Sequence, residues 1–140
     1  MSELSASPIE KRKLEEINHV ALDDYIIDLA WSPDASKLAA ATVEGAIFLI
    51  QPEQEMKAIK YQKVGDHTPG ANSVSWRQDG QEFASAGQDG LVKIWDGNSG
   101  KELCTLEAGA SWVSKVAYNP SNNKLATSAG RHLKVWNEQN

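Results

Sequence analysis

The chain has 140 residues, of which 41% are hydrophobic and 24% are charged, and its formal net charge is −5. This size and composition are ordinary for a globular protein with a hydrophobic core. The acidic balance argues against a nucleic-acid partner, which would need a basic face. The single cysteine, Cys104, excludes an internal disulfide and fits a reducing compartment, so we expect a cytoplasmic protein.

The N-terminal part of the chain is polar. Residues 1–10 are rich in serine and predict a flexible polar tail. Residues 1–16 contain no apolar segment suited to a secretory signal, and no apolar run approaches the roughly 20 residues of a membrane-spanning helix. We therefore expect no membrane partner. Residues 14–22 then predict a β-strand that precedes the first of three similar units.

The rest of the chain divides into short strand-like runs separated by turn signals. In the middle unit, Asp79-Gly80 and Asp89-Gly90 separate apolar runs, which is typical of hairpins because glycine adopts positive φ without steric cost. No apolar row recurs at helical spacing in these units. The predicted strands are 25–31, 37–42, 46–50 and 56–62 in the first unit, 73–76, 81–86, 91–95 and 101–106 in the second, and 112–118, 124–128 and 133–136 in the third.

Two positions recur in every unit. An aromatic residue ends the first strand of each unit, at spacings of 45 and 42 residues: Trp31, Trp76 and Tyr118. A bulky apolar residue ends the third strand of each unit, at spacings of 45 and 41 residues: Ile50, Trp95 and Trp136. A period of about 40–45 residues with four strands per unit is typical of β-propeller blades.

The chain resembles the WD-repeat family of β-propellers over residues 11–137. The residues that carry the resemblance are Trp95-Asp96, the near match Trp136-Asn137, and Asp66-His67 where the family usually has Gly-His. The resemblance implies an all-β fold of three four-stranded antiparallel blades that form an incomplete ring. It divides the chain into units 23–62, 63–106 and 107–140, and makes residues 11–22 the closing outer strand of a last blade. No outer strand of its own is expected after the third strand of unit three.

One polar constellation lies in the middle unit. His67, Ser85 and Asp89 are the three residue types of a catalytic triad. The family resemblance implies instead that these three residues and Trp95 form a structural hydrogen-bond network, which rigidifies a blade when every member is satisfied. The corresponding positions depart from this pattern in unit one (Leu22, Ala40, Glu44 and Ile50) and in unit three (Gly109, Thr127 and Trp136). We therefore expect the network only in unit two.

Other site chemistry is not predicted. One cysteine and three histidines lack any paired metal-ligand spacing, and no glycine-rich phosphate loop appears. Adjacent carboxylates such as Asp23-Asp24 point to opposite faces if they lie in a strand, so they make a poor acid–base pair. We expect no catalytic, cofactor-binding or metal-binding residues, no cofactor, and no enzymatic activity.

The resemblance implies a protein-interaction scaffold. In this family, one face of the disc, formed by the loops that enter the inner strands, is a frequent site for protein partners. Tyr25, Asp24 and Trp112 lie at these entries, and tyrosine and tryptophan are common anchors of interfaces. The rival hypothesis is a propeller that binds a small ligand or catalyses at its central channel, where Asp28 and Lys115 would matter.

Three blades cannot close a ring, since propellers have about 4–8 blades. Either the chain is part of a longer propeller that supplies the missing blades, or a second copy closes the ring by a two-fold exchange. We favour the longer propeller. A third alternative is a truncated product without independent function.

Overall fold

The computed structural model describes residues 12–52 and 59–138, which form eleven strands in three antiparallel sheets and no helix. The all-β prediction is confirmed. The first sheet, blade one, contains β1 (Ile26–Trp31), β2 (Leu38–Thr42), β3 (Ala46–Gln51) and β4 (Lys60–Asp66). Blade two contains β5 (Ala71–Trp76), β6 (Glu82–Gly87), β7 (Leu91–Asp96) and β8 (Glu102–Glu107). Blade three contains β9 (Lys115–Tyr118), β10 (Leu125–Ala129) and β11 (His132–Trp136).

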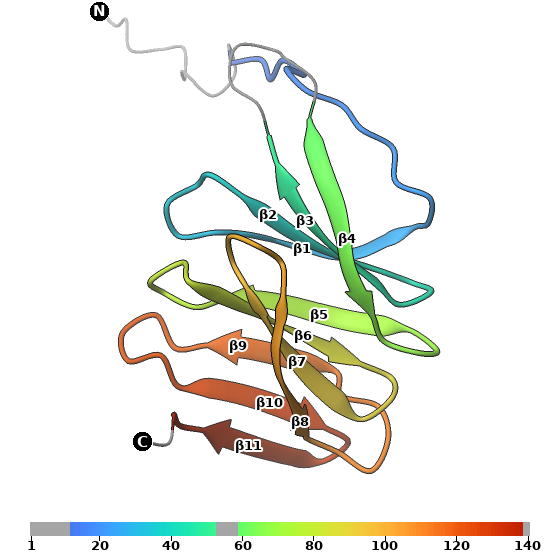
Figure 1. Cartoon of the computed structure of the whole chain (residues 1–140), viewed down its shortest axis with the longest axis vertical. Helices are drawn as coiled ribbons and strands as arrows, with labels where there is room; N and C mark the ends of the chain where they lie inside the picture. The colour runs from blue at the N-terminus through green and yellow to red at the C-terminus, as the bar shows by residue number, and fades with distance from the viewer. Residues whose placement is uncertain (1–11, 53–58, 139–140) are drawn as a thin grey trace, which may run out of the picture.

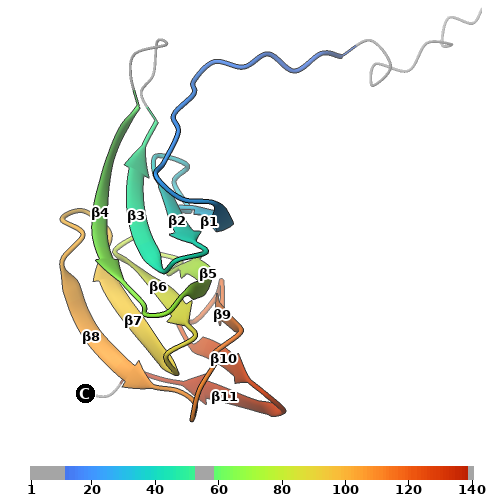
Figure 2. The ribbon, with the colours of Figure 1, turned by 90° about the vertical axis from the view of Figure 1, so that its right-hand side faces the viewer.

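The blades stack face to face in chain order (Figure 1). Each blade is a meander in which consecutive strands pair, and the first strands β1, β5 and β9 lie next to one another. The outer strands β4 and β8 lie at the opposite side of the stack (Figure 2). The predicted Asp-Gly turns carry the expected geometry, with φ of 72° at Gly80 and 82° at Gly90. These turns fix the strand order from which the packing follows.

Two rows of side chains on each blade build the core. In blade two, the front row faces blade one and consists of Val74, Trp76, Phe83 and Trp95; the back row faces blade three and consists of Ala84, Ala86, Val92 and Ile94. The back row of blade one is Ala39, Ala41, Ile47 and Leu49, and it packs on the front row of blade two. The front row of blade three, Val116, Tyr118, Leu125 and Trp136, packs in the same way on the back row of blade two. Small residues on one side let bulky ones on the other approach closely.

The structure corrects several predicted boundaries. Residues 14–22 contain no strand: Leu22 packs beside the cluster of Ala40, Phe48 and Ile50, and the chain before it runs away from the blades (Figure 2). Their pairing with a last blade stays a prediction. The outer strand of blade one is β4 at Lys60–Asp66, not 56–62, and residues 56–58 lie outside the described part. Trp112 precedes β9 instead of lying within it, and blade three has three strands in the described residues.

Candidate functional site

The four side chains of the expected network lie within hydrogen-bond distance of one another in blade two. The indole Nε1 of Trp95 donates to Ser85 Oγ at 2.8 Å, and Ser85 Oγ lies 2.7 Å from His67 Nε2. The other ring nitrogen of the imidazole, Nδ1, lies 3.0 Å from Asp89 Oδ1. Trp95 comes from β7, Ser85 from β6, Asp89 from the β6–β7 turn and His67 from the entry to β5. The bonds thus join two strands, the turn between them and the loop between two blades.

A neutral imidazole satisfies every member of this chain of bonds. Because Ser85 already accepts from Trp95, its own hydroxyl proton is available for His67 Nε2, which leaves Nδ1–H to donate to Asp89. His67 is buried, and burial lowers the pKa of its imidazole below the ordinary value, although Asp89 opposes this shift. The side chains of Ser85 and His67 are buried, so their hydrogen bonds are shielded from solvent.

Two glycines that the sequence analysis did not single out make room for the network. A Cβ on Gly87 would overlap the imidazole of His67 and the carboxylate of Asp89, and a Cβ on Gly65 would overlap the ring of Trp95. Both glycines stand within strands, where glycine otherwise weakens the sheet. Their position inside strands opposite large side chains was the signal that could have found them.

Blade three retains one link of this network, whereas all four side chains come together in blade two. Trp136 Nε1 donates to Thr127 Oγ1 at 3.0 Å, as Trp95 does to Ser85. Gly109 stands where blade two has His67, so the chain of bonds stops at the threonine. In blade one, apolar side chains occupy the corresponding strand positions, and Ala40 and Ile50 are buried with Phe48.

The three proposed partner-binding residues lie at one end of the blades, where the inner strands begin. Tyr25 is 83% exposed and Trp112 is 52% exposed. Asp24 is half-buried, and its carboxylate accepts hydrogen bonds from the backbone N–H groups of Glu44, at 2.6 Å, and Tyr25, at 2.7 Å. The bond from Glu44 holds the pKa of this carboxyl below its usual value. Asp24 therefore fixes the loop that presents Tyr25, whereas the two aromatic rings are free to make contacts.

The two residues of the rival channel hypothesis have different surroundings. Asp28 is half-buried, and its Oδ2 accepts a hydrogen bond of 2.9 Å from the backbone N–H of Val74 in the next blade. Ser73 makes the equivalent bond to Val116 N at 3.2 Å. Lys115, at the same position of blade three, is exposed. Asp28 thus joins two blades, and the structure does not bring it together with Lys115 in a common site.

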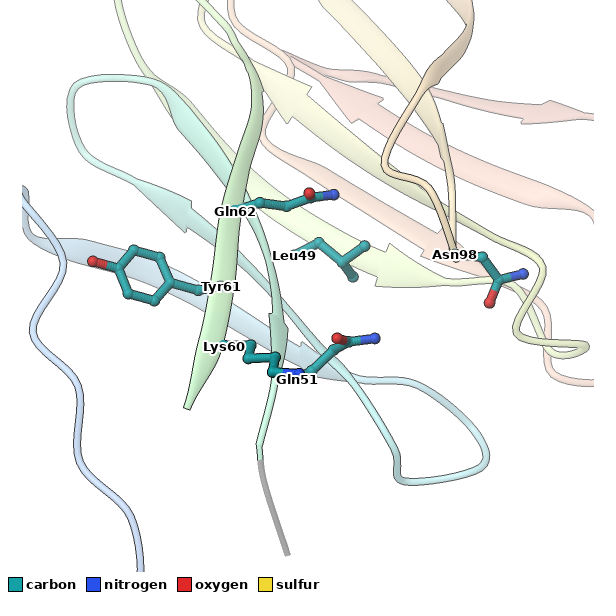
Figure 3. A pocket seen from close by; sticks show the side chains of 6 residues that line it. All are labelled: Leu49, Gln51, Lys60, Tyr61, Gln62 and Asn98. Carbon is teal, nitrogen blue, oxygen red and sulfur yellow. The ribbon is translucent and has the colours of Figure 1, made fainter. Parts of the chain in front are cut away.

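A cavity of about 220 Å³ lies between the outer half of blade one and the turn of blade two that carries Asn98. Figure 3 shows Leu49 and Gln62 directed toward that turn and Tyr61 directed away from it. Gln62 Nε2 donates to Ser99 O at 3.0 Å, so the cavity is bridged by an inter-blade bond. No group of three or more residues that could hold a metal ion occurs in residues 12–52 and 59–138. Within the same ranges, no helix is long and apolar enough to cross a membrane.

Two segments of the chain match a known family of repeats. The family described as "WD domain, G-beta repeat" matches residues 60–96 and 100–137, together more than half of the chain. The small ribosomal subunit protein RACK1 of Caenorhabditis elegans is 36% identical over 70 residues, which are 50% of this chain and 21% of that protein. The chain therefore spans a small part of this relative.

Solved structures share the fold. The RRP9 WD40 repeats superpose with a TM-score of 0.74 at 22% identity, covering 84% of this chain and 37% of that one. The Cps50 (Swd1) β-propeller domain of Myceliophteria thermophila superposes with a TM-score of 0.69 at 21% identity, covering 84% and 36%. In both, this chain matches little more than a third of the neighbour, which is a larger assembly of the same kind of sheet.

Proposed function

Because the chain belongs to the WD40 repeat family of β-propellers, we propose that it is a non-catalytic protein-interaction scaffold and forms part of a larger propeller. Its partner surface is the end of the blades where Tyr25 and Trp112 are exposed. Further blades cover the faces that blades one and three leave open. Members of this family are typically scaffolds without catalytic activity, and a fold by itself does not specify a partner.

The exposed aromatic rings at one end of the blades carry this proposal. Large rings that protrude into water cost free energy of hydration and are common anchors of protein interfaces. Tyr25 stands on a loop held by the bonds of Asp24, and Trp112 adjoins Val113, whose N–H donates to Gly87 O at 2.9 Å. Both rings therefore project from loops of fixed shape, which lowers the entropy lost on binding.

Capture of partners from a cell extract tests the surface. The full chain is used as bait beside the variants Tyr25→Ala and Trp112→Ala, with Tyr61→Ala as the matched control. Tyr61 is an exposed aromatic residue of β4, away from the loops at the blade ends. We expect proteins retained by the wild-type and Tyr61→Ala chains to be lost with the other two variants. Equal retention by all four chains would contradict this surface.

We also propose a cytoplasmic location. The free thiol of Cys104 is exposed, and an exposed thiol of this kind stays reduced in the cytosol. A fluorescent fusion of the full chain in its host, followed by fractionation, tests this assignment. Recovery of the fusion in the periplasmic, secreted or membrane fraction would contradict it.

A further inference from the structure

The end blades expose residues at positions that are buried inside the stack. In blade one the front row is Leu29, Trp31, Leu38 and Ile50, of which Leu29 and Trp31 are exposed, Leu38 is half-buried and Ile50 is buried beside Phe48. In blade three the back row is Ala126, Ser128, Leu133 and Val135. Trp31 is 56% exposed, whereas Trp76 at the matched position is 7% exposed. Leu133 is 72% exposed, whereas Val92 at the matched position is fully buried. Each end of the stack therefore lacks one half of a contact.

The two rows at the ends of the stack contain the same kinds of residues as the two rows that meet at each internal junction. At both internal junctions a back row of two small and two aliphatic residues meets a front row of bulky residues. The open back row of blade three has two small residues followed by leucine and valine, and the front row of blade one has tryptophan among large aliphatic residues, with Leu29 and Trp31 exposed. The chain thus carries both halves of a third junction on opposite ends.

The indole N–H of Trp31 could form the same inter-blade hydrogen bond that the indole N–H of Trp76 forms. In the first junction, Trp76 Nε1 donates to the backbone carbonyl of Ala30 in the preceding blade at 2.9 Å. Ala117 occupies the position of Ala30 in blade three. The indole N–H of Trp31 has no hydrogen-bond partner among the described residues. A blade-three face placed against blade one would bring the carbonyl of Ala117 to this N–H.

The turn between the second and third strands contacts the next blade in blades one and two, but not in blade three. The carbonyl of Gly45 accepts a bond of 2.8 Å from His67 N, and that of Gly90 accepts one of 3.0 Å from Ala108 N, so each turn touches the loop entering the next blade. A Cβ on Gly130, the turn glycine of blade three, would meet no atom within 4 Å. The loop that would fill this space corresponds to the entry of blade one.

Charge complements the contact at this point. The entry loop of blade one carries Asp23, which is exposed, and Asp24, and the open turn of blade three carries exposed Arg131 beside Gly130. A junction built like the internal ones brings this arginine next to these carboxylates, and opposite charges near a surface attract and select orientation. Lys115 departs from the pattern, because it cannot accept the backbone N–H that Asp28 and Ser73 accept at the other junctions.

We propose that the occupant of both open faces is a second copy of this chain, so that blade three of each copy packs on blade one of the other. Two such contacts are related by a two-fold axis and close a ring of six blades, within the range that propellers adopt. This inference rests on the proposed function as part of a larger propeller and names the source of the remaining blades.

The mass of the full chain in solution tests the proposal. Size-exclusion chromatography with light scattering, run over about a hundredfold range of concentration, is expected to give twice the chain mass at the upper end and never more. A single-copy mass throughout would overturn the proposal, because the blades would then have to come from elsewhere. A mass that grows beyond two copies, or insoluble aggregate, would also overturn it, because the contact would not close.

Two kinds of variant show whether these faces make the contact. Leu133→Glu changes an exposed residue of the open back row and is expected to give the single-copy mass, whereas Leu103→Glu, an exposed leucine on β8 outside both rows, is expected to leave the dimer intact. Arg131→Asp is expected to weaken association at least tenfold, and Asp23→Arg in the same chain to restore it. Dimers that persist in Leu133→Glu would overturn the assignment of the faces.

The measurement of mass and the capture of partners test the second-copy proposal and the scaffold surface independently of each other. Capture of partners by Tyr25 and Trp112 is measured on the same wild-type chain and does not require Leu133. If the chain has a single-copy mass while partner capture still depends on Trp112, the second copy is wrong and the scaffold stands. If the dimer forms and the aromatic substitutions have no effect on capture, the scaffold surface is wrong and the ring stands.

Discussion

Blade two and the end blades follow the same sequence pattern but differ in burial. The matched tryptophans Trp76 and Trp31 end equivalent inner strands, and only Trp76 is covered by a neighbouring sheet. Val92 and Leu133 show the same contrast on the opposite face. The comparison teaches that a blade supplies two half-contacts and that its stability depends on what stands beside it, as in other repeat proteins.

The polar network sharpens this contrast. Blade two holds the complete set of His67, Ser85, Asp89 and Trp95, blade three holds only the link from Trp136 to Thr127, and blade one has buried apolar side chains instead. Blade two is thus the blade with both the fullest burial and the fullest set of side-chain bonds. We expect it to be the last part of the chain to unfold.

The largest expected effect is at the matched tryptophans. Trp76→Ala removes a buried ring and its bond to the carbonyl of Ala30, so it is expected to lower the free energy of unfolding by about 3–5 kcal/mol. Trp31→Ala is expected to cost less than about 1 kcal/mol when measured in dilute solution, where the chain is a single copy. Urea denaturation of both variants checks the difference. Equal losses would show that the two rings have equivalent surroundings.

His67→Ala removes the centre of the blade-two network. It leaves Ser85 and Asp89 without their partner and is expected to lower stability by about 1–3 kcal/mol. His19→Ala is the control, because His19 is exposed and its substitution should stay within about 0.5 kcal/mol of wild type. Thermal melting of the three chains is the measurement. An unchanged midpoint for His67→Ala would refute a stabilising role for the network.

Acid is expected to act on blade two before blade one. Because burial lowers the pKa of His67 in the fold, the unfolded chain binds this proton more readily, and stability falls as pH drops through the ordinary imidazole value of 6.5. In blade one, hydrogen bonds from Ser36 lower the pKa of Asp34 to about 2, so its contribution is lost only below the ordinary value of 3.8. For the wild-type chain, the denaturant concentration at the midpoint of unfolding should decrease as the pH is lowered through 6.5. A slope there that His67→Gln leaves unchanged would exclude His67 as its source.

The smallest expected effect is at matched turns. Ala35 adopts φ of 66° at the position where blade two has Gly80 with φ of 72°. A Cβ in this left-handed region costs about 1 kcal/mol or slightly more, so Ala35→Gly should stabilise the chain by up to about 1 kcal/mol and Gly80→Ala should destabilise it similarly. A Cβ on Gly80 has space, since its nearest neighbour lies 4.0 Å away, which confines the effect to the backbone. Shifts of the same sign in the two variants would contradict this account.

Much of the fold was predictable because it depends on local pattern. The repeat of Trp31, Trp76 and Tyr118, together with the Asp-Gly turns, specified short antiparallel strands in three units. The resemblance to WD-repeat blades also predicted which four side chains of blade two would come together, and these side chains are joined by hydrogen bonds. The outer strand at 60–66 was misplaced because strands that are half exposed have weak apolar alternation, and its side chains are mostly exposed.

The period, most of the strands and the residues of each row follow from the sequence, because they depend on alternation and turn chemistry along the chain. Three features became visible in the folded chain: Asp28 joins two blades, Gly65 and Gly87 make room for Trp95 and His67, and residues 12–22 form no strand. The physical reason is that these features depend on atoms far apart in the chain. A strand needs a partner edge, and a carboxylate takes its role from the N–H group that the fold places beside it.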